Sequence, residues 1–220
     1  MDTISTAIGA GRSQATGPKS TARRTEIIRT AIGIINARSY ELATMREIAA
    51  ALDLRDAALY YYYPSKQALA YAAHVYSLER FARVLELSFA SPGTGLERLR
   101  CWLLNFLEES DEHGPQLYFG EHSYLDESQR RYIDEWAGRL TSSIAAVVQD
   151  GIEDGSIRQC EVQLVVQLLL GMLIWLAKWT LSVEGLTPAR LMQAIEDLTF
   201  AGLDARSARD LTATTRFDND

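Results

Sequence analysis

The chain has 220 residues, of which 47% are hydrophobic and 23% are charged, as in an ordinary soluble globular protein. The net charge of −7 argues against a uniformly basic nucleic-acid binder. The charge is uneven, however, because residues 1–70 carry +3 and the remainder carries −10. A basic N-terminal module on an acidic body indicates an anionic partner at one end only.

Cysteine usage and hydropathy exclude further classes. Cys101 and Cys160 have no metal-binding spacing and form no disulfide framework, so a cytoplasmic location is expected. No apolar signal core is present near the N-terminus. The most apolar run, residues 164–177, is interrupted by Gln167 and is shorter than the roughly 20 residues that span a bilayer. We therefore expect a buried helix there and no membrane association.

Helical periodicity continues through nearly the whole chain, and no alternating strand pattern is present, so the sequence predicts an all-α fold. Residues 1–19 are polar and small and are expected to form a disordered basic arm. The chain between 111 and 120 is expected to be a loop with at most one helical turn. The expected helices cover residues 22–37, 45–52, 56–63, 65–89, 96–109, 126–153, 161–183 and 188–203.

Helix starts carry recognisable caps. Ser65 and the Thr187-Pro188 pair are typical first residues of helices, and Pro64 ends the helix before it. Three pairs have the spacing of a capping box, in which the first side chain caps the third residue of the helix and the second reaches back. These pairs are Thr44 with Glu47, Thr94 with Glu97, and Asp126 with Gln129.

Four consecutive tyrosines precede Pro64 on the second of two short helices, and such a pair of helices joined by a tight turn is a helix-turn-helix motif. At 100° per residue, Leu59 and Tyr63 share the core face. Tyr60, Tyr61 and Tyr62 then lie on the other faces, where a phenol can contact a base edge or a phosphate. The alternative is that these three rings pack under the helices of the body.

The run from Thr44 to Lys66 resembles the DNA-binding segment of tetracycline-repressor (TetR) family regulators. The pairs Ile48-Ala49, Leu59-Tyr60 and Ser65-Lys66 and the aromatic Tyr63 fall in register with that family's pattern. The resemblance implies a helix-turn-helix domain over residues 20–66 with its motif at 44–63. It further implies a ligand-binding and dimerisation domain over 67–205, followed by a flexible tail over 206–220.

One part of the motif departs from the family. Asp53-Leu54-Arg55 stands where Gly-Val-Ser is usual, so Asp53 is expected to take the left-handed turn conformation. The small alanine side chains of the second helix of the motif let it lie close to the floor of a DNA groove. Thr44 and Lys66 could bind phosphates. Carried over by position, the resemblance implies DNA contacts from Thr44, Arg46, Arg55, Ala57, Ala58, Tyr60, Tyr61, Tyr62 and Lys66.

The body is expected to dimerise and to bind a small molecule. A two-fold dimer fits because one reading helix covers only a half-site, and helices 161–183 and 188–203 are the expected interface. The alternative is that 161–183 is a core helix with no interface role. The resemblance implies an effector pocket among the middle helices, with aromatic candidates, although such rings are more often plain core. The candidates are Trp102, Phe106, Tyr118, Phe119, His122, Tyr124, Trp136, Trp175 and Trp179.

Enzymatic chemistry has no support in the sequence. There is no Gly-x-Ser-x-Gly elbow, no phosphate-binding glycine loop and no His-Glu-x-x-His motif, and His113 and His122 fit no metal pattern. We expect no cofactor and no metal. The leading hypothesis is a DNA-binding transcriptional regulator, a repressor released from a palindromic operator by a small, largely apolar effector. The alternative is a helical interaction module whose basic end binds an acidic protein.

Overall fold

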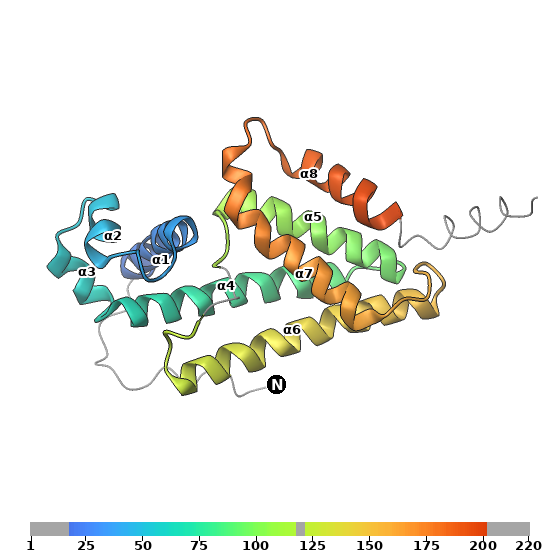
Figure 1. The fold of residues 1–220 in the computed structure, drawn as a ribbon, viewed down its shortest axis with the longest axis horizontal. Helices are drawn as coiled ribbons and strands as arrows, with labels where there is room; N and C mark the ends of the chain where they lie inside the picture. The colour runs from blue at the N-terminus through green and yellow to red at the C-terminus, as the bar shows by residue number, and fades with distance from the viewer. Residues whose placement is uncertain (1–17, 118–121, 202–220) are drawn as a thin grey trace, which may run out of the picture.

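The computed structural model describes residues 18–117 and 122–201, and within these the regular structure is entirely helical (Figure 1). Two further turns, Thr180–Ser182 and Glu196–Phe200, are 3-10 and π-helical. The α-helices are α1 (Pro18–Arg38), α2 (Met45–Ala51), α3 (Asp56–Tyr62), α4 (Lys66–Phe89), α5 (Gly95–His113), α6 (Glu127–Glu153), α7 (Val162–Trp179) and α8 (Pro188–Ile195).

The N-terminal three helices pack around their own core at one end of the long helix α4 (Figure 1). Ile27 from α1, Ile48 from α2 and Leu59 from α3 are completely buried together. Leu69 of α4 joins the same cluster, so the first part of α4 packs as a member of this domain. The apolar positions recur at helical spacing, which is why these short helices fold against one another rather than alone.

A second core holds the body together, with Trp102 of α5 fully buried among side chains of α4, α6, α7 and α8. Helices α5 and α6 cross where Gly95 faces Gly151. A Cβ atom added to Gly95 would lie 2.3 Å from the Gly151 nitrogen, so only glycine permits this approach. Residue 95 is thereby fixed beside the C-terminal part of α6.

The predicted caps are confirmed with one exception. Thr94 with Glu97 and Asp126 with Gln129 both form complete capping boxes. Thr44 accepts a hydrogen bond from the Glu47 nitrogen, but the Glu47 carboxylate does not return it. Instead, Glu47 pairs with Arg38 at 2.6 Å, so an ion pair to α1 replaces the second half of the box.

Several predicted boundaries were wrong. Helix α1 begins at Pro18, so the last two residues of the expected arm are helical; the others lie outside the described residues, as does the expected tail at 206–220. Helix α5 continues to His113 instead of ending near 109, because Gly114, at φ 81°, terminates it. The apolar pattern stops earlier than the helix does, since residues 110–113 are all polar.

Helix α7 has one buried and one exposed apolar face, which corrects the expectation of a buried helix. Leu169 and Leu173 are in the core, whereas Leu168 is 74% exposed and Trp175 is 61% exposed. In the described part of the chain, α7 is the one helix whose length and mean hydropathy of 1.7 would suit a membrane span. The helix ends at Trp179 and the chain continues as a 3-10 turn, where a continuous helix to 183 was expected.

Candidate DNA-reading surface and effector cavity

The turn between α2 and α3 is formed as predicted. Asp53 has φ 53°, which lies in the left-handed region. The TetR-family pattern usually has glycine at this position. The Leu54 nitrogen then donates to the Ala49 carbonyl at 2.9 Å, which closes the turn. Arg55 is the N-terminal residue before α3; its side chain makes no capping bond and is exposed.

The four tyrosines divide between core and surface. Tyr63 is buried with Leu59, as predicted, whereas Tyr60 is 49% exposed and Tyr61 is 62% exposed. Tyr62 is half-buried, and its ring meets that of Tyr61 edge to face, with 5.5 Å between the centroids. Tyr60 and Tyr61 therefore do not pack under the body, which removes the alternative for these two rings.

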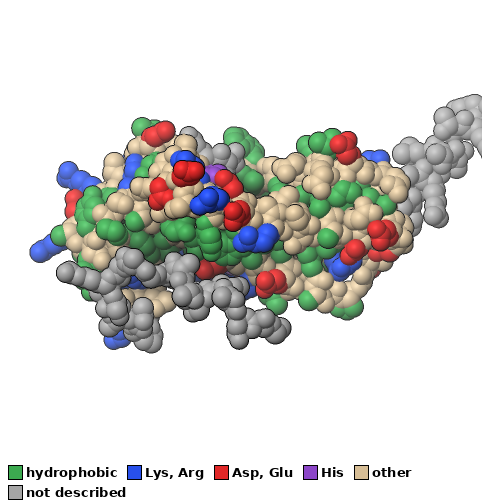
Figure 2. Space-filling model, turned by 90° about the horizontal axis from the view of Figure 1, so that it is seen from below, with side chains coloured by type: hydrophobic (Ala, Val, Ile, Leu, Met, Phe, Trp, Pro, Cys, Tyr) green, Lys and Arg blue, Asp and Glu red, His purple; other side chains and the backbone are tan. Residues whose placement is uncertain are grey.

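Other candidate DNA-contacting side chains share the surface at this end of the molecule. Thr44, Arg46 and Ala57 are exposed, and Ala58 is half-buried. Figure 2 shows Lys and Arg side chains projecting from the end that carries α2 and α3. The exposed atoms present cationic donors and phenol groups together, which suits a polyanionic partner.

Lys66 occupies a different position from the one expected of a phosphate contact. Its ammonium donates to the carbonyl oxygens of Tyr40, Glu41 and Ala43 at 2.8, 3.3 and 3.0 Å. An ammonium has three donors, so this set uses all of them. A phosphate bond from Lys66 would have to replace one of these internal bonds.

Two arginines of α1 hold this helix against α2 and α3. Arg24 donates to the Tyr62 carbonyl at 2.9 Å, and its guanidinium lies 5.5 Å from the centroid of the Tyr63 ring. Arg23 donates to the Leu52 carbonyl at 3.1 Å. These bonds satisfy backbone groups at the C-terminal ends of α2 and α3. Helix α1 is therefore hydrogen-bonded to the ends of both helices.

The body contains a cavity of about 560 Å³ between α4, α5, α6, α7 and α8. Its lining is mainly aliphatic and includes Leu78, Leu107, Leu140, Leu170 and Leu191. This volume is within the range of small-molecule sites in proteins. The polar side chains that line it are Ser110, Asp111, Gln116, Thr141, Gln167, Thr180 and Thr187.

Of the aromatic residues expected at a pocket, Phe106 is the one found in the described lining. Trp102 is wholly in the core, and Trp179 packs partly buried against it. Trp175 lies on the exposed face of α7. Tyr118 and Phe119 lie outside the described residues.

The remaining three candidates pack beside α4. Trp136 lies edge-on to Tyr132, with 5.7 Å between ring centroids. Tyr124 stacks on Tyr40 at 3.5 Å, and His122 bonds Asp134 at 2.8 Å. These large flat side chains fill the joints between helices, whereas the cavity lining is mainly aliphatic.

His74 of α4 is completely buried and bonds the Tyr124 hydroxyl at 2.8 Å. Burial, together with His122 whose ring lies 6.0 Å away, lowers the pKa of His74 to about 4. The imidazole is therefore neutral near pH 7. Within the described ranges no group of three His, Cys, Asp or Glu side chains could hold a metal ion.

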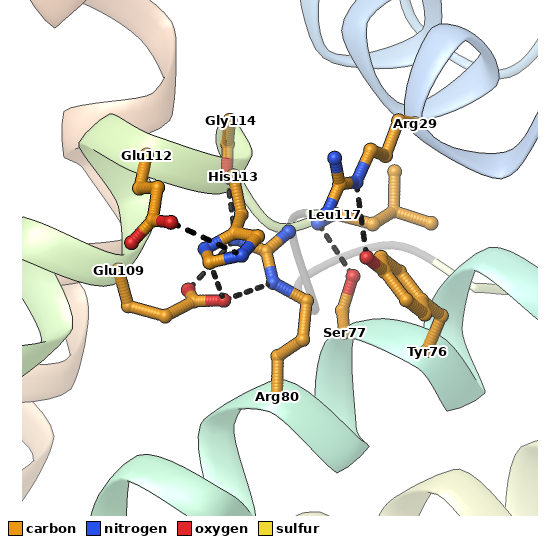
Figure 3. Close-up of polar contacts among 9 residues, drawn as sticks. All are labelled: Arg29, Tyr76, Ser77, Arg80, Glu109, Glu112, His113, Gly114 and Leu117. Atoms are coloured by element: carbon orange, nitrogen blue, oxygen red, sulfur yellow. Dashed lines mark hydrogen bonds and ion pairs between the residues drawn. The ribbon is translucent and has the colours of Figure 1, made fainter. Parts of the chain in front are cut away.

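Residues 114–117 form the cavity wall between α5 and the start of the undescribed segment, and α4 holds them in place (Figure 3). The Leu117 nitrogen donates to Ser77 at 2.9 Å, and Arg80 donates to the Gly114 carbonyl at 2.7 Å. Arg80 is also paired with Glu109 through two bonds of 2.6 and 2.7 Å. A buried arginine on the apolar face of the α4 pattern was a signal that sequence reasoning missed.

Comparison with known proteins agrees with this arrangement. The profile described as bacterial regulatory proteins of the tetR family matches residues 27–73, and that of the tetracyclin repressor-like C-terminal domain matches residues 92–203. No curated protein matches the chain.

Solved structures with the same fold are numerous. KstR2, the ketosteroid transcriptional regulator of Mycobacterium tuberculosis, is 20% identical with a TM-score of 0.72, over 87% of this chain and 97% of its own. PfmR from Thermus thermophilus is 23% identical with a TM-score of 0.67, over 81% and 98%. AibR, solved with isovaleryl coenzyme A and operator DNA, is 24% identical with a TM-score of 0.66, over 81% and 98%.

These likenesses establish the fold, and the two profile matches establish the family. One profile covers the helix-turn-helix with its exposed tyrosines, and the other covers the helices around the cavity. The chain belongs to the TetR family of DNA-binding transcriptional regulators, a family of regulators rather than enzymes.

Proposed function

We propose that this regulator is a cytoplasmic repressor that leaves a palindromic operator when a small, largely apolar effector enters the cavity. The observation that carries the DNA-reading part is the exposure of Tyr60 and Tyr61 on α3, next to Arg55. Phenols at these positions contact base edges, while Arg46 contacts phosphate and Arg55 contacts phosphate or a guanine edge.

A homodimer through α7 and α8 supplies the second reading helix. Leu164, Leu168 and Trp175 are exposed on one face of α7, and Leu198 is exposed in the π turn that follows α8. Several large apolar side chains exposed along one helix face are typical of an interface rather than of a solvated face. Covering it with the same face of a second chain gives two-fold symmetry, which matches a two-half-site operator.

The aliphatic cavity supports an effector with a mainly apolar body. That AibR was solved with isovaleryl coenzyme A and operator DNA is consistent with a small effector controlling DNA binding on this fold. Bound molecules would favour one of two dimer shapes and so change the separation of the reading helices. Helix α4, which contributes to both cores, would carry part of that change.

The experiment that tests this proposal is selection of random duplex DNA by the purified protein, at roughly physiological salt, followed by sequencing. We expect enrichment of a palindrome with two half-sites, and an affinity that falls steeply as salt rises. If no sequence is enriched and binding to an acidic protein is found instead, the interaction-module alternative holds. Enrichment of an unrepeated half-site would contradict the dimeric reader.

A further inference from the structure

Gln116 is the buried polar side chain of the cavity wall, only 7% exposed. Neither its Nε2 nor its Oε1 atom has a hydrogen-bond partner among the described residues. A buried amide without partners is costly, and nearly all such groups in native proteins are satisfied. Gln116 lines a cavity that is otherwise dominated by aliphatic side chains, and both amide atoms lie beneath the accessible surface of its wall.

The charge of the cavity limits which group can pair with that amide. Among the described lining residues there is no Lys, Arg or His, and the one ionisable side chain is Asp111. A carboxylate or phosphate at Gln116 would be desolvated without a counter-charge, which is strongly unfavourable. An uncharged carboxamide or lactam can donate its N–H to Oε1 and accept from Nε2 through its carbonyl oxygen, so neither atom of Gln116 stays unpaired.

Gln116 is also bonded to the DNA-binding domain. Its backbone carbonyl accepts from Asn36 Nδ2 of α1 at 2.8 Å, and the Asn36 carbonyl accepts from Lys178 Nζ of α7 at 2.6 Å. The adjacent Leu117 lines the cavity and is buried in the core of the N-terminal domain. One short segment is thus cavity wall and domain core together.

On the basis of the function proposed above, we propose that Gln116 recognises an uncharged, amide-like end of the effector and passes occupancy to α1 through Asn36. A ligand that pairs with the side chain repositions the 116 peptide, and Asn36 follows because it is 5% exposed and bonded to that peptide. Because Arg23 and Arg24 join α1 to the ends of α2 and α3, the reading helix moves with it.

Recognition is tested with three matched probes: octanamide, N,N-dimethyloctanamide, which lacks the donor, and octanoate, which is anionic at pH 7. Isothermal titration calorimetry on the full chain should show octanamide binding at least about tenfold more tightly than the other two. Gln116→Leu should reduce that preference to less than about twofold, and Gln116→Met should do the same.

Gln167→Leu is the matched control, because Gln167 lines the same cavity but is exposed, so that water can satisfy its amide. This variant should keep the preference for octanamide. The assignment is overturned if octanamide does not bind the wild-type chain, if either other probe binds as tightly, or if Gln167→Leu abolishes the preference as Gln116→Leu does.

The connection to α1 is tested with Asn36→Ala on the duplex recovered by selection. Octanamide should change the DNA affinity of the wild-type chain at least about fivefold. Asn36→Ala should still bind octanamide but change its DNA affinity less than about twofold. Asn36→Ser, which is smaller but polar, is a second variant in case the alanine variant does not fold.

An undiminished response in a folded Asn36 variant would overturn the route through α1. Failure of the wild-type chain to bind any duplex would instead contradict the proposed function, and the calorimetric comparison of the three probes would still decide the role of Gln116. The two failures are therefore distinguishable.

Discussion

Lys66 Nζ donates a 2.8 Å hydrogen bond to the carbonyl oxygen of Tyr40 and lies 4.3 Å from the centroid of the Tyr40 ring. The first residue of α4 is thus bonded to the chain between α1 and α2. We predict that Lys66→Met lowers the free energy of unfolding by about 1–3 kcal/mol, because carbonyls lose a charged donor. Urea denaturation measures this change.

Arg46→Met is the matched control for that variant, since Arg46 is exposed on α2. It should leave stability within about 0.5 kcal/mol while weakening binding to all duplexes alike and reducing the salt dependence. A Lys66→Met protein of wild-type stability with uniformly weaker DNA binding would restore Lys66 as a phosphate contact.

Tyr61 is expected to read sequence rather than to support the fold. Because its ring is 62% exposed, Tyr61→Ala should change the free energy of unfolding by no more than about 0.5 kcal/mol. Binding to the selected operator should weaken by about 1–3 kcal/mol, with little effect on unrelated DNA. Fluorescence anisotropy with both duplexes checks the difference. An equal loss on both would assign Tyr61 to the DNA backbone.

The dimer should depend on the exposed face of α7. Leu168→Glu, at a position that is 74% exposed, places a charge in the proposed interface and should convert the dimer to monomer at micromolar concentration. Sedimentation velocity gives the mass directly. Leu87→Glu is the control, because Leu87 is also exposed but lies on α4. Dissociation by Leu87→Glu alone would move the interface to α4.

The Arg80–Glu109 pair should be a major support of the cavity wall. Its arginine side chain is 2% exposed, so Glu109→Leu leaves a buried guanidinium without its carboxylate and should cost about 3–5 kcal/mol. Glu112→Leu, three residues further along the same helix and 77% exposed, should cost less than about 0.5 kcal/mol. If Glu109→Leu lowers the free energy of unfolding no more than Glu112→Leu does, the Arg80–Glu109 pair contributes little to stability.

His74 should make the fold less stable in mild acid. Its pKa of about 4 in the folded chain lies below the 6.5 of an ordinary histidine, so the unfolded chain binds the proton more readily between these values. The contribution of the neutral imidazole to the free energy of unfolding is fully present above pH 6.5 and decreases as the pH falls towards 4. The expected loss between pH 7 and pH 5 is about 2 kcal/mol.

Urea unfolding of wild type and His74→Gln at both pH values tests this expectation. The glutamine variant keeps a polar group near the Tyr124 hydroxyl but cannot titrate, so its stability should decrease less between pH 7 and pH 5. Equal decreases in both proteins would assign the acid sensitivity to other groups.

The sequence by itself determined the helical class, the helix-turn-helix and most caps, because these depend on neighbours within one or two turns. Thr94 with Glu97 and the exposed tyrosines are examples. The aliphatic cavity was not predictable, because aromatic side chains that look like a binding site instead fill joints between distant helices, as Tyr124 does against Tyr40.

Tertiary structure alone decided which polar groups meet. Asn36 and Gln116 are 80 residues apart, and residue 116 lies outside regular helix, where no periodicity indicates what it faces. Lys66 likewise changes from a free cation to an internal donor once α4 lies beside the chain between α1 and α2. Local patterns specify helices, whereas burial and long-range hydrogen bonding assign each side chain its partner.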